Sequence, residues 1–395
     1  MKWPEFATEA FCLKVVGGGT PSTKQREFYG GEIPWVRTQE VLFNYINSTE
    51  LTITDAGLQH SSATWVPAYS VIVAMFGASA GRVAINTIPV TTNQACCNLV
   101  IDHTAADYRY VFYALRSRYR ALESRSRGAA QKNLNASIVK EFMIPKPPLT
   151  IQRRIGGLLS AYDELIENNR RRIQLLEQAA RLLYKEWFVH LRFPGHEHVK
   201  ITNGVPDGWE KKMLGDLCKE IRESVSPDAF EPDTPYIGLE HIPRCSISLN
   251  EWGMAEQVTS SKHRFRENEI LFGKIRPYFH KVGIAFVNGV ASSDAIVIRP
   301  LSDFLKPLVL MTVSSDGFVA VTSQTMKEGS KMPRADWKQM QQYVVPLPPD
   351  GLLGMFNSVI EPIVQQLKVL SFHNRKLGTA RDLLLPRLMN GTIPV

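Results

Sequence analysis

Basic and amide side chains gather in two stretches of the sequence, and their chemistry suits contacts with nucleic acid. The first stretch, from Tyr113 to Lys140, holds seven Lys or Arg residues and a single acidic one, Glu123. Arginine and lysine suit phosphate contacts, which position a protein without reading sequence. The amides of Gln131 and Asn133 offer the paired donor and acceptor that an adenine edge requires.

The second stretch mixes basic and aromatic residues around Lys274, Arg276 and Tyr278 and continues later with Lys331 and Arg334. For any one arginine, a solvated basic surface is an equal alternative. Because two separate stretches share the pattern, nucleic acid is the better interpretation. The net charge of +8 also favours an acidic partner, although charge alone does not separate nucleic acid from a membrane surface.

The sequence contains no motif of a known catalytic site. The glycine-rich residues 77–82 lack the lysine and hydroxyl of a phosphate loop, and 17–19 lead into a turn rather than a helix. Asp207 and Glu210 superficially resemble a nuclease pair, but they fall in a predicted turn. Scattered histidines and five cysteines without a CxxC pair indicate neither a metal site nor a disulfide framework. We predict a non-catalytic chain with no cofactor and no metal.

Length and composition are those of an ordinary globular protein. The 395 residues, of which 44% are hydrophobic and 21% charged, suit two or three domains. The odd number of cysteines fits a reducing compartment. The N-terminus has no apolar signal core, and no apolar run approaches the roughly 18 residues of a membrane span. We expect a soluble, cytoplasmic protein.

Two long amphipathic stretches must position these groups, and each follows a cluster of prolines, which cannot occupy a helix interior. Apolar residues in both step by three and four, as in a coiled coil. The seam predicted for the first helix is Ile151, Ile155, Leu158, Tyr162, Leu165 and, after one irregular step, Ile166, Asn169, Ile173, Leu176, Ala180, Leu183 and Trp187. The seam predicted for the second is Leu353, Phe356, Ile360, Ile363, Leu367, Leu370, Asn374, Leu377, Arg381, Leu384 and Leu388.

The two helices are predicted to pair, with Asn169 and Asn374 fixing the register. Pro362 favours a kink or a late start of the second helix. The alternative is that each stripe belongs to the ordinary core of a helical domain.

The sequence repeats itself at an offset near 201 residues. Residues 33–36 (IPWV) recur at 234–237 (TPYI), and 145–148 (PKPP) recur at 346–349 (PLPP). Gly128 and Gly329 follow the same offset, and Gln94-Ala95 matches Asp294-Ala295 one residue closer. The order and the near-constant offset indicate a tandem duplication of one unit, a domain followed by a long helix.

Each domain has an α+β pattern. Short apolar, β-branched segments bounded by Gly, Pro and Asn predict strands. These segments are 70–76, 82–85 and 95–101 in the first copy, and 269–272, 281–287 and 295–298 in the second. A helix follows in each copy, at 108–123 and 304–314, and residues 193–208, rich in Gly, Pro and His, indicate a linker.

In this order of motifs the chain resembles the specificity subunits of type I restriction-modification enzymes. The resemblance rests on Gly17–Ser22 (GGGTPS), Ile33–Val36, the Gly77–Gly81 loop, Asn93–Ala95, Gly128 with Gln131 and Asn133, Ile144–Ile155, Val345–Pro349 and Asp382–Leu388 with Gly391. It covers nearly the whole chain. The second copy departs from the pattern, because it lacks the GGGTP turn and the glutamine after its second proline pair.

The resemblance implies an α+β fold of two target recognition domains separated by two antiparallel coiled-coil helices. The expected boundaries are 1–146 for recognition domain 1, 147–193 for the central spacer helix, 194–208 for the linker, 209–347 for recognition domain 2 and 348–395 for the C-terminal spacer helix. The expected DNA-contacting residues are Thr20, Ser22, Lys24, Arg37, Arg82, Asn93, Arg125, Arg127, Gln131, Lys132, Asn133, Lys274, Arg276, Tyr278, Lys331 and Arg334.

The implied function is sequence-specific recognition of a bipartite site in double-stranded DNA. The implied partners are two methyltransferase subunits, which use S-adenosylmethionine, and the restriction subunits, so the chain itself supplies recognition and scaffold but no catalysis. The rival interpretation is a non-catalytic coiled-coil scaffold whose basic domains bind protein, membrane or nucleic acid without specificity. A self-contained nuclease or methyltransferase is disfavoured by the missing motifs.

Overall fold

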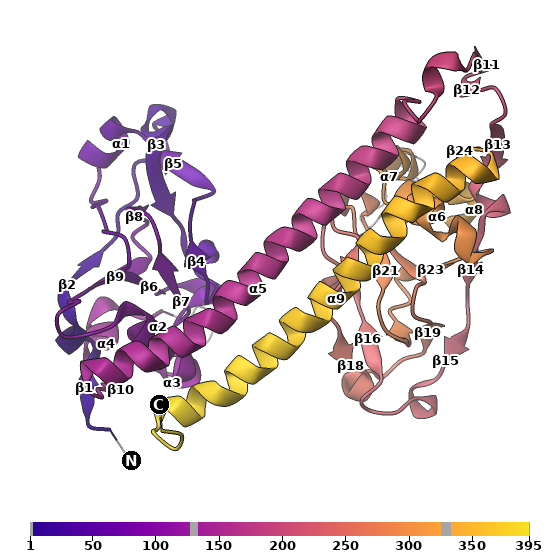
Figure 1. Ribbon diagram of the computed structural model, residues 1–395. Helices are drawn as coiled ribbons and strands as arrows, with labels where there is room; N and C mark the ends of the chain where they lie inside the picture. The colour runs from indigo at the N-terminus through magenta and orange to yellow at the C-terminus, as the bar shows by residue number, and fades with distance from the viewer. Residues whose placement is uncertain (1–2, 127–132, 325–332, 395) are drawn as a thin grey trace. The chain divides into compact units, whose positions relative to one another are not determined.

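The structure, a computed structural model, describes residues 3–126, 133–324 and 333–394. The chain forms two compact units (Figure 1). Unit 1 comprises Met1–Leu165 with Leu377–Val395, and unit 2 comprises Ile166–Lys376. Each unit therefore combines a globular domain with parts of two long helices.

The larger sheet of unit 1 is buried on both faces. Its strand order is β2-β9-β6-β7-β4, with bounds Cys12–Gly17, Cys96–Ile101, Val71–Ala74, Val83–Asn86 and Tyr45–Ile46. Because successive side chains of a strand point to opposite faces, Val71 and Val73 enter one core while Ile72 and Ala74 enter another. The all-apolar sequence of β6 follows from this double burial.

A helix covers one face of this sheet and a smaller sheet covers the other. Helix α2 (Tyr108–Ser117) is buried between the sheet and the long helix that follows. The smaller sheet has the order β5-β3-β8, with bounds Leu51–Ile53, Tyr29–Val36 and Thr91–Thr92. The remaining helices of the domain are short: α1 (Asp55–Gln59), α3 (Tyr119–Glu123) and α4 (Ala136–Glu141). The single helix predicted at 108–123 is thus two, separated at Arg118.

Unit 2 repeats this topology, which confirms the predicted duplication. Its larger sheet has the matching order β14-β23-β20-β21-β17, with bounds Cys218–Ile221, Ala295–Pro300, Ile270–Gly273, Val282–Ala285 and Ser248–Leu249. Its second sheet has the order β15-β19-β22-β16-β18, with bounds Ser224–Val225, Lys262–Phe265, Gly289–Ala291, Pro235–Ile237 and Gly253–Met254. The predicted α+β class is confirmed in both units.

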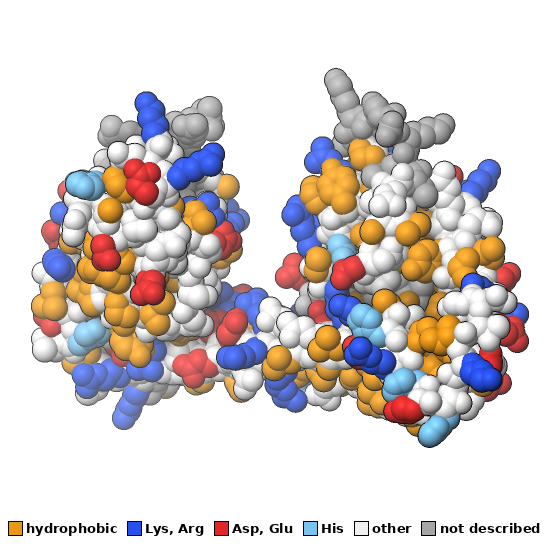
Figure 2. All heavy atoms as spheres, turned by 90° about the horizontal axis from the view of Figure 1, so that it is seen from above, with side chains coloured by type: hydrophobic (Ala, Val, Ile, Leu, Met, Phe, Trp, Pro, Cys, Tyr) orange, Lys and Arg blue, Asp and Glu red, His pale blue; other side chains and the backbone are white. Residues whose placement is uncertain are grey.

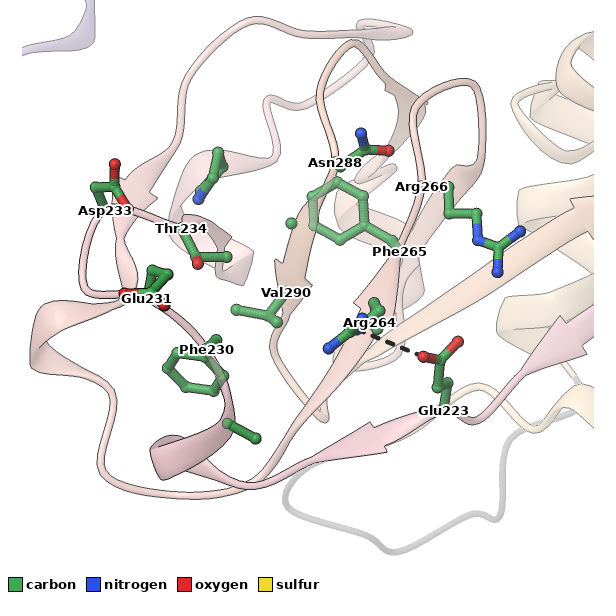
Figure 3. Close-up of a pocket in the computed structure, with 13 residues that line it drawn as sticks. Glu223, Phe230, Glu231, Asp233, Thr234, Arg264, Phe265, Arg266, Asn288 and Val290 are labelled. Carbon is green, nitrogen blue, oxygen red and sulfur yellow. Dashed lines mark ion pairs between the residues drawn. The ribbon is translucent and has the colours of Figure 1, made fainter.

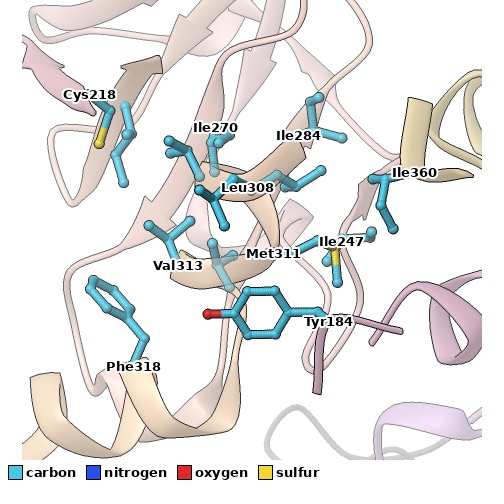
Figure 4. Packing of buried hydrophobic residues seen from close by; sticks show 14 of the residues in the cluster. Tyr184, Cys218, Ile247, Ile270, Ile284, Leu308, Met311, Val313, Phe318 and Ile360 are labelled. Carbon is cyan, nitrogen blue, oxygen red and sulfur yellow. The ribbon is translucent and has the colours of Figure 1, made fainter. Parts of the chain in front are cut away.

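The main core of unit 2 forms around helix α6 (Lys306–Val313). Figure 4 shows Leu308 and Met311 of this helix among Ile270 and Ile284 of the sheet, with Tyr184 reaching in from the first long helix. Helix α7 (Asp316–Gln324) follows and was not predicted from the sequence, and α8 (Trp337–Met340) completes the domain. In the described residues no single helix could cross a membrane, although Asp303–Val313 and Asp316–Gln324 together, bent by 64°, satisfy length and composition.

Each domain closes with a two-stranded antiparallel pair directly before a long helix. Strand β1 (Glu5–Ala7) pairs with β10 (Met143–Pro145), and β13 (Glu210–Met213) pairs with β24 (Val344–Leu347). The proline clusters end these pairs, so the helices begin immediately afterwards. The linker contains a small hairpin of β11 (Ile201–Thr202) and β12 (Val205–Pro206).

The long helices are α5 (Leu149–Tyr184), which continues as a π-helical turn over Lys185–Val189, and α9 (Asp350–Met389). Both starts agree with the sequence prediction, but a late start at Pro362 is wrong. Helix α9 is continuous from Asp350 with Pro362 inside it. In unit 2 the two helices run antiparallel, because Asn169 Nδ2 donates to Asn374 Oδ1 at 3.0 Å and Trp187 contacts Phe356. The predicted asparagine pair is confirmed.

The predicted seam of α5 is correct in its second half and partly wrong in its first. Ile166, Ile173, Ala180 and Trp187 are buried against unit 2 or its helix partner. Leu158 and Leu165, however, are exposed, and the buried position in unit 1 is Leu159. Helix α5 carries two apolar heptad stripes, an exposed one through Leu158 and Leu165 and a buried one through Leu159 and Ile166. The predicted seam passes from the first stripe to the second, which explains its irregular step.

Candidate nucleic-acid interface

Strand direction brings the candidate residues of each unit to one end of its larger sheet. In unit 1, β2 and β6 end where β9 and β7 begin, because each neighbouring pair is antiparallel. The connections at this end are 17–22, 75–82 and 93–95, and residues 133–135 lie beside them; we call this set the first loop edge. The second loop edge is its counterpart in unit 2, residues 222–223, 274–281, 292–294 and 333–335.

A glycine run fixes the turn that carries Thr20 in the first loop edge. The Gly18 and Gly19 N–H groups donate to the carbonyls of Cys96 and Thr92. A Cβ on Gly18 would lie 2.0 Å from the Asn93 carbonyl oxygen, so only glycine permits this approach. Thr20 Oγ1 then lies 3.5 Å from the Gln94 nitrogen. Ser22 and Lys24 follow in the same turn with exposed side chains.

Arg37 and Asn93 are neighbours because strands β3 and β8 are parallel. The Asn93 N–H donates to the Val36 carbonyl, and the Asn93 Oδ1 accepts from the Cys96 thiol at 3.2 Å. The Arg37 guanidinium pairs with the carboxylate of Glu50, which directly precedes strand β5. The charge of Arg37 is therefore partly neutralised, and it is a weaker phosphate-binding candidate than the sequence suggested.

Asn133 joins the first loop edge through a bridge with Phe76. Arg82 lies at the end of the same loop, and its Nε is buried without a hydrogen bond within the described part of the chain. Arg125 is exposed and its guanidinium lies over the Phe142 ring at 5.0 Å. The structure thus brings Thr20, Asn93, Arg82 and Asn133 to one end of the sheet. Arg127, Gln131, Lys132 and Lys331 lie outside the described residues.

The second loop edge unites Lys274, Arg276, Tyr278 and Arg334. A bridge between Ile275 and Arg334 is the counterpart of the Phe76–Asn133 bridge. Lys274 Nζ donates to the Ser293 carbonyl at 3.0 Å, and Arg334 pairs with Asp294 at 3.4 Å. Burial lowers the pKa of Lys274, and burial together with nearby Lys274 lowers the pKa of His263. Both pKa values fall chiefly because burial disfavours the charged form, and the nearby carboxylate of Glu220 opposes the fall in both.

Several arginines of the first basic stretch are structural. Arg116 pairs with Asp163 and Asp382, and Arg118 pairs with Glu5 and donates to the Met143 carbonyl. These partners lie far away in the sequence, so a sequence pattern cannot reveal them. Arg116 and Arg118 are thus held by intramolecular partners, and a part for them in a DNA-binding face stays a prediction.

Sequence reasoning also missed a contributor to the second loop edge. The Arg244 guanidinium stacks on the Phe279 ring at 4.0 Å and so braces the loop that carries Tyr278. Nothing in the pattern around Arg244 signals this, because Phe279 is distant in sequence. In the view of Figure 2, Lys and Arg side chains of each unit lie among uncharged and acidic ones rather than in one continuous basic field.

A surface pocket of about 780 Å³ in unit 2 lies apart from the second loop edge. Figure 3 shows its apolar side chains Phe230, Phe265 and Val290, with Arg264 paired to Glu223 at 3.4 Å. Gly289, where β22 begins, lines the pocket, whereas the loop edge follows the other end of this strand. No cluster of potential metal ligands occurs among the residues described by the structure.

Comparisons with known proteins agree with this arrangement. The family described as "Type I restriction modification DNA specificity domain" matches residues 2–178 and 206–352, one match per repeat. The type I restriction enzyme MjaIX specificity subunit of Methanocaldococcus jannaschii is 26% identical over 97% of this chain and 91% of its own length. The EcoR124I/EcoR124II specificity subunit of Escherichia coli is 29% identical over 41% of each chain.

A solved structure has the same fold. The crystal structure of the type I restriction-modification S subunit from M. genitalium superposes with a TM-score of 0.61 at 15% identity, covering 98% of this chain and 96% of the other. The family match extends over far more than half of the sequence and includes both repeats. This chain therefore belongs to the type I restriction-modification DNA specificity family and is the non-catalytic DNA-recognition subunit of such a complex.

Proposed function

We propose that the chain reads a bipartite sequence in double-stranded DNA, with the first loop edge contacting one half-site and the second loop edge the other. The observation that carries this proposal is the repeated bridge, Phe76 with Asn133 and Ile275 with Arg334. It brings polar and basic side chains to the same end of the sheet in both units. Two similar edges on a duplicated fold suit two separate short sequences better than one continuous sequence.

The candidate DNA-contacting residues of the two units divide by chemistry into two roles. Lys24, Arg125 and Arg276 are exposed cations and suit phosphates, which fix position on the duplex. The amides of Asn93 and Asn133 suit base edges, where their paired donor and acceptor match adenine. Arg334 can reach guanine, provided that DNA displaces its partner Asp294. Gln131 and Lys331 keep the roles that the sequence indicates.

We further propose that two methyltransferase subunits dock on the outward faces of the long helices and that restriction subunits join this complex. In unit 2, Leu175 and Leu182 lie seven residues apart on α5, Val189 follows seven residues later in the π-helical turn, and the three are 56%, 62% and 58% exposed. Met355, Val359 and Val369 form a similar exposed stripe on α9. A heptad stripe of exposed leucine favours a partner helix. One stripe on each of the duplicated helices favours two copies of the partner.

The scaffold alternative makes a different prediction for DNA. A scaffold with basic faces would bind any duplex, with an affinity set by salt alone. A recognition subunit would also discriminate between sequences. The family membership favours the second, and the half-sites themselves depend on side-chain contacts with DNA.

The test is methylation mapping of genomic DNA from cells that carry this chain with its methyltransferase partner. Cells that lack only this chain are the control. We expect a new methylated motif of two short half-sites separated by an unread spacer. A continuous motif, or no new motif with an active partner, would contradict the proposal.

The docking surface can be tested separately. The double change Leu175→Glu with Leu182→Glu places two charges in the stripe and should abolish co-purification with the methyltransferase subunit on that side. Because both side chains are exposed, the melting temperature should change little. The matched control is Gln174→Glu with Gln178→Glu, which adds the same charge at exposed positions beside the stripe. Equal loss of binding in the control would argue against a specific contact.

A further inference from the structure

One loop of the candidate interface has positive φ at its first and last residues in both units. These residues are glycines in unit 1 but carry large side chains in unit 2. In unit 1 it runs from Gly77 to Gly81, and these two glycines have φ of 73° and 84°. In unit 2 it runs from Arg276 to His280, where φ is 50° and 52°. A 3₁₀ turn lies within each loop, over Gly77–Ser79 and Pro277–Phe279.

The loop of unit 2 is strained where that of unit 1 is not. Glycine adopts positive φ without a clash, whereas arginine and histidine bring Cβ too close to the backbone carbonyl. Such strain persists only where the surrounding structure enforces it, and it gathers at binding sites. Unit 2 therefore keeps side chains in a loop for which glycine would be the easier choice.

The loop of unit 2 is held rigidly at both ends. Pro277 is buried, and the Arg276 N–H donates to the Pro333 carbonyl at 2.9 Å. The His280 side chain is buried with Nε2 2.9 Å from the Ser314 carbonyl oxygen, and the His280 carbonyl accepts from the Cys245 N–H. A loop fixed in this way is preorganised, so little freedom is lost when a ligand binds.

The rigid loop presents one aromatic side chain to solvent. Tyr278 is 53% exposed, and its hydroxyl makes no hydrogen bond within the described part of the chain. Its ring contacts Phe279 edge to face at 5.0 Å, and Phe279 is in turn covered by the Arg244 guanidinium. A tyrosine supported from behind offers a large, stiff contact surface with one polar end.

We propose that Tyr278 is a specificity-determining residue that lays its ring against base-pair edges in the half-site read by unit 2, with Arg276 on an adjacent phosphate. An aromatic ring can cover a thymine methyl group, and the hydroxyl can exchange a hydrogen bond with a base edge. The corresponding residue of unit 1 is Ser79, so unit 1 reads its half-site without an aromatic at this place. The inference rests on the proposed bipartite recognition.

The experiment compares methylated motifs produced by the complete complex with the wild-type chain, Tyr278→Ala, Tyr278→Phe and Tyr69→Ala. Tyr278→Ala should lose about tenfold discrimination at one or two neighbouring base pairs of one half-site and leave the other half-site unchanged. Tyr278→Phe, which keeps the ring and loses only the hydroxyl, should retain any base preference that rests on the apolar contact. Tyr69 of unit 1 is the control, because it is similarly exposed but precedes β6, at the end of the unit 1 sheet opposite to the first loop edge.

An unchanged motif in Tyr278→Ala would overturn this inference, and so would a uniform loss of methylation without any relaxed position. Absence of a split motif with the wild-type chain would instead overturn the proposed function, so the two failures are distinguishable.

Arg276→Gly tests the strain directly. This change relieves the positive φ and removes the charge, so the melting temperature should stay the same or rise by a few degrees. DNA binding should weaken, and its logarithmic salt slope should fall by about one. A lower melting temperature with unchanged DNA binding would make Arg276 a structural residue and overturn its part in the proposal.

Discussion

The larger sheets of the two units have matching strand orders, but different polar contacts hold each unit to helix α5. In unit 2, Glu177 Oε1 accepts hydrogen bonds from Ser246 Oγ at 2.7 Å and from the N–H and hydroxyl of Ser248 at 3.0 Å and 2.6 Å. It also accepts from the Ile247 N–H at 3.1 Å, and the whole side chain is 5% exposed. One carboxylate oxygen thus holds the start of edge strand β17.

Unit 1 uses another carboxylate on the same helix. Asp163 accepts from the Tyr113 hydroxyl and pairs with Arg116 and with Arg381 of α9. Burial and the nearby Asp163 raise the pKa of Tyr113 above its ordinary value, so it stays protonated and donates. The turn before β4, which corresponds to the one that Glu177 holds, is capped instead by Asn44, whose Oδ1 accepts from the Leu42 N–H.

This difference separates the interactions that both copies of a duplicated fold share from those that each copy makes alone. Apolar contacts between helix and domain are non-directional, so the same pattern serves both copies. Buried carboxylates need partners at fixed positions, so each copy has its own set. Asp163 and Glu177 lie two heptads apart in the sequence of α5, one in each unit.

The largest effect is expected from Glu177→Ala. It removes the acceptor shared by four donors at the start of β17, of which only the Ser248 N–H has a second partner, Ser246 Oγ, and should destabilise unit 2 by about 3 kcal/mol. Hydrogen exchange should therefore speed up for amides of β17 and β21, while the equivalent strands β4 and β7 of unit 1 remain protected. Gln178→Ala, on the exposed face beside Glu177, is the control. Equal protection of the β17 amides in the variant and in the wild type would show that the hydrogen bonds to Glu177 do not hold this strand.

An intermediate effect is expected from Gly77→Ala in unit 1. The new Cβ would meet no atom within 4 Å, so only the positive φ opposes alanine. We expect a loss of about 1 kcal/mol in unfolding free energy, measured by denaturant titration. The control is Gly157→Ala, because Gly157 has equal space but lies in helix α5, where alanine should stabilise. A gain of stability in both variants would contradict the account of strain in this loop.

The smallest expected effect is a loss of stability of unit 2 at low pH. Burial and Lys274 lower the pKa of His263 below its ordinary value of 6.5. The unfolded chain therefore binds this proton more readily than the folded one, so stability falls as the pH drops below about 6.5 and is unaffected above it. Melting curves between pH 7.5 and 5 should show a decline that His263→Gln reduces by about one or two degrees.

Much of the fold could be predicted from the sequence because its signals are local. Strands β6, β7 and β9 have β-branched, apolar sequences bounded by turn residues, and β20, β21 and β23 repeat them. Proline fixes where both long helices begin, and Asn169 and Asn374 interrupt apolar stripes at matching places. Helix α7 was not predicted because it is short: its buried residues Phe318, Val319 and Thr322 cover little more than one helical turn, too few to display a period of 3.6 residues.

The candidate interface was predicted less completely, because charge density does not say what a charge faces. Arg116 and Arg125 lie in one basic stretch, yet Arg116 pairs with Asp382, 266 residues away, while Arg125 is exposed. Arg37 was expected to be available to DNA but is paired with Glu50. Ion pairs between distant segments form only when the chain is folded, and they leave no periodic signal.

The sequence by itself determined the duplication, the α+β class, the helix starts and the residue types available for DNA. Each follows from short-range chemistry: side-chain periodicity, the missing N–H of proline, and the conformational freedom of glycine. Only the tertiary structure decided which heptad stripe of α5 is buried, and that the loops of one sheet end form an edge. It also decided that Arg276 and His280 adopt the φ of Gly77 and Gly81. Those features depend on which distant segments pack together, because burial and ion pairing are properties of the folded chain.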